Sequence, residues 1–279
     1  MQPISVDAAP LARLRARLAR LGAPLCLGID PHPDALPSGL PADVGGIETF
    51  ARGIVEAASE HAVAVKINVA FFEAFGASGI AALERVRADL PGDLFVILDA
   101  KRGDIGPTAE RYAAALFGHL EADAVTLSPY LGEDAVEPFL AFPDRVVYVL
   151  ARTSNPSAAT VQDLTVDGEL LYERVARWVA ERWPGGRVGL VVGATRPEDL
   201  RRLRDIAPSP AFLVPGVGAQ GGELAAAVAC CHGTDAPGVV NVSRAIAGAS
   251  RGDDWHEAAA AAAAALRASM QEVGATLGG

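Results

Sequence analysis

Eight short apolar runs recur along the chain, and the segments between them have helical composition. Each run is rich in β-branched residues and is bounded by turn residues. Near-continuous apolar strands that alternate with amphipathic helices indicate parallel pairing, with helices covering both faces of the sheet. This alternation restricts the fold more than any other feature of the sequence. The runs lie at residues 23–30, 62–71, 93–101, 123–130, 145–153, 187–195, 211–218 and 238–246.

Eight strand and helix units in 279 residues suit a closed barrel. We therefore predict an α/β chain that folds as a single (β/α)8 TIM barrel, with a doubly wound open sheet as the alternative. Leucines at helical spacing before the first run predict an extra N-terminal helix at about residues 7–21, with a transit peptide as the alternative. No linker-like composition divides the chain. We therefore expect one domain over residues 1–279, whose barrel spans about residues 23–270.

The longest segment without a helix or strand pattern follows the fifth run. It covers residues 152–168 and contains turn-forming Ser, Asn, Pro, Asp and Gly. Irregular segments of this length inside a compact domain are typically binding loops or lids, and we expect such a role here.

Acidic side chains outnumber basic ones by 34 to 24, and the net charge is −10. The chain therefore has no overall electrostatic attraction for nucleic acid or for an anionic membrane surface. Any anionic ligand must be met by basic groups that are placed locally, which predicts a specific pocket.

The three cysteines fit neither a disulfide framework nor a paired zinc spacing, because Cys230 and Cys231 are adjacent and Cys26 is remote. We expect a reduced cytoplasmic protein with no metal site. An alanine-rich segment at residues 258–266 is too short and too weakly apolar to span a bilayer, and its composition predicts a helix.

Ionisable side chains are nearly absent from the interiors of the runs and gather at their carboxyl ends. In a (β/α)8 barrel the active site lies at that end of the strands. The candidates are Asp30 after the first run, Lys66 and Asn68 in the second, Asp99 and Lys101 in the third, Ser154 after the fifth, Pro215, Gly216 and Gln220 at the seventh, and Ser243 and Arg244 in the eighth.

The stretch LDAKRGDIGPT holds the densest group of charges. Strand side chains alternate faces, so Asp99 and Lys101 are expected to point to one side, beside Lys66 of the neighbouring strand. Asp104 on the following loop would complete an alternating row. Flanking carboxylates raise a lysine's affinity for its proton, which would keep Lys101 charged. A buried ion-pair network that only fixes the barrel rim is the alternative.

The stretch PGVGAQGG matches the dinucleotide pattern G-x-G-x-x-G at Gly216, Gly218 and Gly221. The acidic residue that such a site needs after the next strand is replaced by Ser243 and Arg244. A phosphate site is the better interpretation, formed by backbone N–H groups, the following helix N-terminus, Gln220 and Arg244. A glycine-rich turn needed only for packing is the alternative.

LDAKRGDIGPT resembles the signature Asp-x-Lys-x-x-Asp-Ile/Val-x-x-Thr of the orotidine 5′-phosphate decarboxylase family. Five further motifs occur in that family's order between about residues 23 and 247, namely GID, KINVAFFE, TSNP, PGVGAQGG and NVSRAI. The forms CLGIDP, KxNxAFFE and DAKRGDI look like the bacterial subgroup with longer loops.

The resemblance implies a cofactor-free loss of carbon dioxide from C6 of orotidine 5′-monophosphate, which gives uridine 5′-monophosphate in pyrimidine synthesis. It implies that Lys101 protonates the C6 carbanion and that Asp99 and Lys66 hold Lys101 in place, while Lys66 also contacts the ribose. The remaining substrate contacts would come from Asp30 to a ribose hydroxyl, Ser154 and Pro215 to the base, and Gln220 and Arg244 to the phosphate, with Asn68, Gly216 and Ser243 also expected at the substrate.

The resemblance also implies a homodimer. In the family, the residues at Asp104, Ile105 and Thr108 reach into the active site of the neighbouring subunit. Two other functions stay open: a metal-dependent sugar-phosphate decarboxylase or aldolase of the same superfamily, and a phosphate-binding barrel without catalysis. Ile105, Thr108 and the TSNP segment disfavour the first, and the intact charged row disfavours the second.

Overall fold

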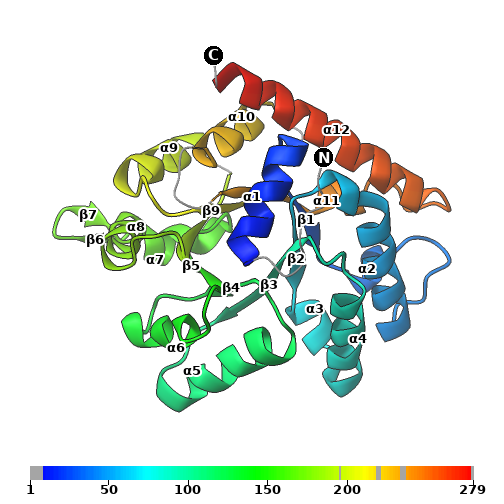
Figure 1. The fold of residues 1–279 in the computed structure, drawn as a ribbon, viewed down its shortest axis with the longest axis horizontal. Helices are drawn as coiled ribbons and strands as arrows, with labels where there is room; N and C mark the ends of the chain where they lie inside the picture. The colour runs from blue at the N-terminus through cyan, green and yellow to red at the C-terminus, as the bar shows by residue number, and fades with distance from the viewer. Residues whose placement is uncertain (1–8, 195, 218–220, 233–236, 278–279) are drawn as a thin grey trace. The chain divides into compact units, whose positions relative to one another are not determined.

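Eight parallel strands follow one another around a closed barrel in the computed structural model, in the order β1-β10-β9-β8-β5-β4-β3-β2 (Figure 1). The model describes residues 9–194, 196–217, 221–232 and 237–277. The prediction of a (β/α)8 barrel is confirmed, and the open sheet is wrong. The strands are β1 (Leu25–Ile29), β2 (Ala64–Asn68), β3 (Phe95–Arg102), β4 (Ala124–Leu127), β5 (Val146–Arg152), β8 (Val188–Val192), β9 (Phe212–Pro215) and β10 (Val239–Val242).

Seven of the eight apolar runs contain one of these strands entirely, and β3 extends one residue beyond the third run. Most of their side chains are buried, because helices cover the outer face of the sheet and neighbouring side chains fill its inner face. At β5 and β8, Tyr148 lies opposite Gly189. A methyl group on Gly189 would come within 2.8 Å of the Tyr148 ring, so this glycine makes room for a tyrosine in the barrel core.

The main helices agree with the helical segments of the sequence. Asp43 caps α2 by accepting a hydrogen bond from the Gly46 N–H at 3.0 Å, and α9 begins at Pro197 as helices often do. The helix after β3 continues into a π-helix at Ala114–His119. The helices are α1 (Pro10–Leu21), α2 (Val44–Ala58), α3 (Ala70–Glu73), α4 (Gly76–Ala88), α5 (Gly106–Ala113), α6 (Glu137–Leu140), α7 (Ala159–Gln162), α8 (Leu171–Arg182), α9 (Pro197–Ile206), α10 (Gly221–Cys230), α11 (Arg244–Ala247) and α12 (Trp255–Leu277).

The chain packs as two compact units, which we describe separately. Unit 1 consists of Met1–Ala100 and Val242–Gly278, and unit 2 contains Lys101–Asn241. The expectation of one domain over residues 1–279 stays a prediction. Within the described ranges no helix is long and apolar enough to cross a membrane.

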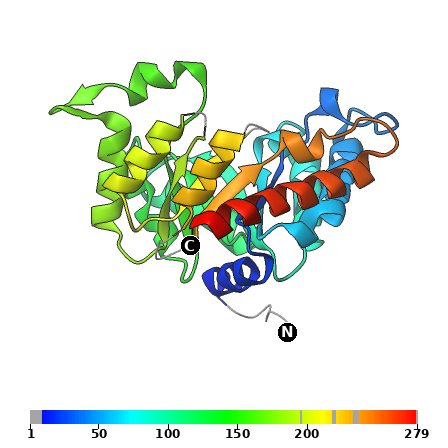
Figure 2. The ribbon, with the colours of Figure 1, turned by 90° about the horizontal axis from the view of Figure 1, so that it is seen from above.

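In unit 1 the predicted N-terminal helix is confirmed as α1, and Arg17 holds it. The buried Arg17 guanidinium donates to the carbonyl oxygens of Ala62 at 3.0 Å and Ser59 at 2.6 Å, and it forms an ion pair with Asp93 at 2.5 Å. The Gln271 amide of α12 donates to the Leu21 carbonyl oxygen at 2.6 Å, which places the end of α12 beside α1 (Figure 2). The helix is therefore part of the fold of unit 1.

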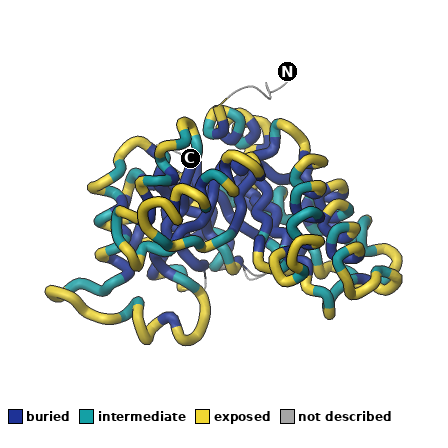
Figure 3. The backbone as a smooth tube through the Cα atoms, turned by 90° about the horizontal axis from the view of Figure 1, so that it is seen from below, coloured by how far each residue is buried: buried dark blue, intermediate teal, exposed yellow. Residues whose placement is uncertain are grey.

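The sequence indicated that the segment after β5 is irregular. In unit 2 of the structure, this segment instead has regular secondary structure. It contains α7 and a hairpin of β6 (Thr165–Val166) and β7 (Glu169–Leu170). Asp167 and Gly168 form the two-residue turn with φ of 54° and 82°, the backbone that Asp-Gly hairpin turns favour. We call residues 153–170 the excursion; much of its length is exposed, in contrast to the buried strands (Figure 3).

Candidate active site

Lys66 and two carboxylates form a buried charged cluster in unit 1. The Lys66 ammonium donates to Asp99 Oδ2 at 3.0 Å and to Asp30 Oδ1 at 3.4 Å. Lys66 is 4% exposed, and Asp99 is buried as well. Because β1, β2 and β3 are parallel and in register, Lys66 in the middle of β2 lies within reach of Asp30, directly after β1, and of Asp99 in the carboxyl-terminal half of β3. We call them the Lys66 cluster.

The Lys66 cluster keeps its lysine protonated. Burial disfavours the ammonium, but the charges of Asp99 and Asp30 and the hydrogen bond to Asp99 outweigh that effect and raise the pKa of Lys66 above its usual value. Beneath the cluster, burial raises the pKa of the Cys26 thiol to about 12. The cluster therefore has one fixed positive charge and an inert, uncharged thiol below it.

The other candidates of unit 1 lie at strand ends as expected. Asn68 ends β2, and its side-chain oxygen accepts a hydrogen bond from the Ala70 N–H at 3.2 Å, so it also shapes the start of α3. Ser243 follows β10, and Arg244 begins α11. Arg244 is exposed, and its guanidinium makes no hydrogen bond or ion pair with the residues that the structure describes, so it is available to an anion.

In unit 2, Lys101 has an unusual backbone. Its φ is 45°, although it lies in β3, and its side chain is exposed. Its N–H donates to Thr126 Oγ1 at 2.9 Å. Regular alternation of side chains requires extended backbone, so the argument that placed Lys101 on the same face as Asp99 does not hold at Lys101. The prediction that Asp99 and Lys101 point to one side stays a prediction.

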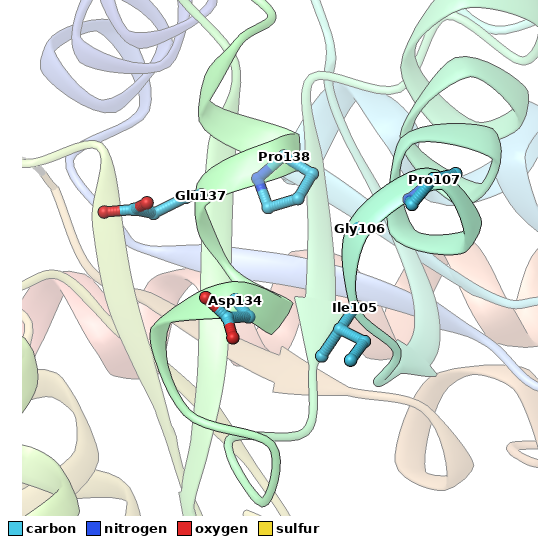
Figure 4. Close-up of a pocket in the computed structure, with 6 residues that line it drawn as sticks. All are labelled: Ile105, Gly106, Pro107, Asp134, Glu137 and Pro138. Carbon is cyan, nitrogen blue, oxygen red and sulfur yellow. The ribbon is translucent and has the colours of Figure 1, made fainter.

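Asp104, Ile105 and Thr108 lie on the loop after β3 and at the start of α5. Asp104 Oδ1 accepts a hydrogen bond from the Ile105 N–H at 2.8 Å, and Ile105 is 50% exposed. A pocket of about 390 Å³ adjoins them, with Ile105 and Pro107 on one side and Pro138 on the other (Figure 4). Its remaining lining comes from Gly106, Asp134 and Glu137.

The structure brings Ser154 close to two glycines at the ends of β8 and β9. A methyl group on Gly193 would lie 3.2 Å from the Ser154 nitrogen, and one on Gly216 would lie 3.8 Å from Ser154 Oγ. Gly216 has a φ of 88° and follows Pro215, which ends β9. Gln220, together with Gly218, lies outside the described residues.

Sequence analysis missed a second buried charged cluster, at the end of β5. The Arg152 guanidinium is hydrogen-bonded to Asp163 and, at 3.0 Å, to Asp199, and it stacks 4.7 Å from the centre of the Tyr172 ring. We call these four residues the Arg152 cluster. An arginine closing an apolar strand was the available signal, but its partners are 11 and 47 positions away. Thr126 was missed too, because an isolated threonine in a strand carries no pattern.

No group of three or more His, Cys, Asp or Glu side chains in the described ranges is arranged to hold a metal ion.

Charged side chains at the carboxyl ends of parallel barrel strands define a (β/α)8 barrel enzyme. Comparison with known proteins identifies the enzyme family to which the chain belongs. A family model described as Orotidine 5'-phosphate decarboxylase / HUMPS family matches residues 23–262. The chain belongs to this family.

Similar proteins support this assignment over most of the chain. The orotidine 5'-phosphate decarboxylase of Roseiflexus castenholzii is 51% identical over 246 residues, which cover 87% of this chain and 90% of the relative. That of Thermomicrobium roseum is 46% identical and covers 94% of each chain. The structure of Leishmania donovani OMP decarboxylase is 38% identical, with a TM-score of 0.82, and covers 96% of this chain and 99% of that one.

The family resemblance seen in the sequence is thus confirmed, and the relatives include bacterial ones. The enzyme class is that of the carboxy-lyases. Family membership supports decarboxylation of orotidine 5′-monophosphate in pyrimidine biosynthesis as the activity.

Proposed function

We propose that this protein converts orotidine 5′-monophosphate to uridine 5′-monophosphate without a cofactor and that Lys101 protonates C6 within a network of Lys66, Asp99, Lys101 and Asp104. The observation that carries the proposal is the Lys66 cluster, in which an ammonium is kept charged by two carboxylates. It occurs in a chain of the orotidine 5'-phosphate decarboxylase / HUMPS family that retains the whole Asp-x-Lys-x-x-Asp motif.

The proposed chemistry follows from the loss of negative charge at the substrate carboxylate and its development at C6. The bond between C6 and the substrate carboxylate breaks, its electron pair stays on C6, and neutral carbon dioxide leaves. A carboxylate beside Asp104 is repelled in the ground state, whereas the C6 carbanion faces the ammonium of Lys101, which then delivers a proton to it. Lys66 and Asp99 hold the charged row in place, so the transition state is favoured over the bound substrate.

Binding of the rest of the substrate is proposed for the other strand ends. Asp30 and Lys66 would bind the ribose, Ser154 and Pro215 the pyrimidine, and Arg244 with Gln220 the phosphate, with Asn68, Gly216 and Ser243 nearby. The exposed guanidinium of Arg244, which has no partner among the described parts of the chain, supports the phosphate assignment. Binding energy gained at the phosphate can be used to close loops over the reacting carbon, and it should then appear in kcat as well as in KM.

We also propose that the protein is a cytoplasmic homodimer in which Asp104, Ile105 and Thr108 of one subunit complete the site of the other. Ile105 supports this proposal, because half of a large apolar side chain is left uncovered in the single chain. Sedimentation velocity at micromolar concentration, with an Ile105→Asp variant as control, would test it. A wild type that sediments as a monomer would contradict the dimer.

The function is tested by following the ultraviolet absorbance of orotidine 5′-monophosphate with purified protein and excess chelator. Wild type should remove the orotate band, and Lys101→Ala should not, although it still binds uridine 5′-monophosphate. Arg244→Ala should lose roughly 2–5 kcal/mol of phosphate binding, as expected for a truncated charged partner. Turnover by Lys101→Ala would overturn the mechanism. No turnover by wild type would direct attention to metal-dependent sugar phosphates and then to a binding barrel without catalysis.

A further inference from the structure

The strained backbone of Lys101 needs a physical explanation. Among the described residues, four that are not glycine have positive φ: Lys101, Glu121, Asp144 and Asp167. The last three lie in turns or loops, where such backbone is common, and only Lys101 lies within a strand. A left-handed lysine costs free energy and persists only where its surroundings hold it, and such residues concentrate at functional sites.

The neighbouring strand β4 supplies the surroundings. Thr126, 1% exposed, places its hydroxyl oxygen 2.9 Å from the Lys101 nitrogen and accepts the hydrogen bond of that N–H. Two residues further along, the Ser128 N–H donates to the Arg102 carbonyl oxygen at 2.8 Å. Gly103 also approaches closely, since a methyl group there would lie 3.2 Å from Ser128 Cβ. Hydrogen bonds from Thr126 of β4 and from Ser128 just after it thus hold Lys101 and Arg102, and Gly103 leaves room for Ser128.

Thr126 differs from the other contacts because its side chain makes the bond. The Ser128 contact uses backbone N–H, which any residue other than proline would supply. The other side chains of β4 are Ala124, Val125 and Leu127, which have no polar atom. Thr126 is therefore the residue of β4 whose identity decides whether the Lys101 amide has an acceptor in its left-handed conformation.

We infer that Thr126 is a positioning residue for the reaction: by accepting the Lys101 N–H, it holds the lysine in the left-handed turn that presents its ammonium to C6. The inference rests on the proposed role of Lys101 as proton donor. If the bond is removed, the backbone at Lys101 relaxes toward extended φ and its ammonium moves away from the reacting carbon. Displacements of about 1 Å at a reacting group cost on the order of a hundredfold in rate.

Two variants of Thr126 separate this role from simple packing. Thr126→Val keeps the shape and removes the acceptor, and it should lower kcat by roughly 10- to 100-fold while KM and uridine 5′-monophosphate affinity stay within about twofold of wild type. Thr126→Ser keeps the hydroxyl and should restore kcat to within roughly threefold. Val125→Ala is the matched control: it shortens a buried side chain of the same strand and should lower the melting temperature without lowering kcat.

A second measurement does not depend on turnover. Hydrogen exchange of the Lys101 amide, followed by NMR, should be at least tenfold faster in Thr126→Val than in wild type, and it should be slow again in Thr126→Ser. Unchanged exchange in Thr126→Val would overturn the inference, as would unchanged kcat in an active enzyme or failure of Thr126→Ser to recover. If wild type itself does not turn over orotidine 5′-monophosphate, the proposed function fails, and the exchange rates still decide whether Thr126 holds this amide.

Discussion

The Lys66 cluster and the Arg152 cluster each contain one buried cation and two carboxylates, but they join different parts of the fold. Each has a buried cation bonded to two carboxylates near the carboxyl end of a barrel strand. In the first, all three residues lie in or directly after β1, β2 and β3. In the second, the carboxylates come from the excursion and from α9, and the phenol of Tyr172 in α8 adds a long hydrogen bond of 3.5 Å to Asp199.

The choice of cation matches the difference in surroundings. A lysine ammonium is a compact charge whose pKa responds to its environment, whereas a guanidinium is a planar fork that stays charged and can stack on an aromatic ring. A lysine between strand residues suits a site that must control charge near a substrate. An arginine between a strand, a loop and a helix suits an anchor, and here it joins Asp163 of the excursion to Asp199 of α9.

Among these variants, Lys66→Met should cause the largest losses of turnover and stability. Smaller losses than those of Arg152→Met would contradict the distinction between a catalytic cluster and an anchor. We expect turnover to fall by at least about 10³-fold, by analogy with the loss of one preorganised charged group. We also expect a loss of about 3–5 kcal/mol in the free energy of unfolding, because the variant removes the ammonium that is bonded to the buried Asp99 and the partly buried Asp30. Steady-state kinetics and urea unfolding measure the two effects.

The double variant Lys66→Met with Asp99→Asn sharpens this test. It removes the cation and the nearer negative charge together, so it should recover stability relative to Lys66→Met alone while turnover stays absent. Recovery of turnover would mean that the Lys66 cluster serves the fold and not the reaction.

Arg152→Met should cost about 3 kcal/mol of stability, at the lower end of the range for a broken buried pair because Asp163 is a third exposed. The excursion should become the preferred site of limited proteolysis, and turnover should fall by only about tenfold because the chemical groups remain. Arg182→Met is the control, since this exposed arginine of α8 also bonds two carboxylates and its loss should lower stability far less than Arg152→Met does. Equal effects of both variants would remove the distinction between anchor and surface pair.

The two clusters should also differ in their response to alkali. A folded pKa raised above the unfolded value stabilises the protein below the unfolded pKa, and that contribution is lost as pH rises. Cys26, raised from 9.0 to about 12, should therefore cost up to about 1.4 kcal/mol per pH unit above pH 9. The loss for Lys66 begins only above the ordinary lysine pKa of about 10.4. In the Arg152 cluster the guanidinium stays charged, whereas burial raises the pKa of Tyr172, so a loss of stability begins there only above the ordinary tyrosine pKa of about 10.

Denaturant unfolding of wild type and Cys26→Ala between pH 7 and pH 11 measures this response. The stability difference between the two proteins should be constant below pH 9 and should shift in favour of Cys26→Ala above it. A constant difference across the whole range would show that the thiol ionises as readily in the folded protein as in the unfolded one.

Tyr172→Phe should have the smallest effect, a loss of about 0.5–1 kcal/mol, because the hydrogen bond to Asp199 is long and the ring remains under the guanidinium. Tyr172→Leu should cost more, since it also removes the cation–π contact. Thermal unfolding of the two variants distinguishes them, and an equal loss in both would assign the whole contribution to the hydroxyl.

Much of the fold was predictable because it follows from local periodicity. Each apolar run contributed a strand, and a helix lies after most of the runs, because apolar periodicity and a helix-starting residue such as Pro197 act within a few positions. The hairpin in the excursion was missed although the Asp167–Gly168 turn was visible, because two-residue strands are too short to show alternation. The π-helix after α5 carries no signal in the sequence.

By itself, the sequence determined the barrel class, the family motifs and the residue types at the strand ends, because strand alternation with helices and the order of motifs are properties of a linear pattern. Only the tertiary structure decided which carboxylates meet Lys66, that Lys101 is left-handed and bonded to Thr126, and that Arg152 joins Asp163 to Asp199. Those contacts link residues 11 to 47 positions apart. These contacts depend on strand register, which sets the distance between side chains, and on burial, which sets the local dielectric constant. Register and burial cannot be read from the neighbours of a residue along the chain.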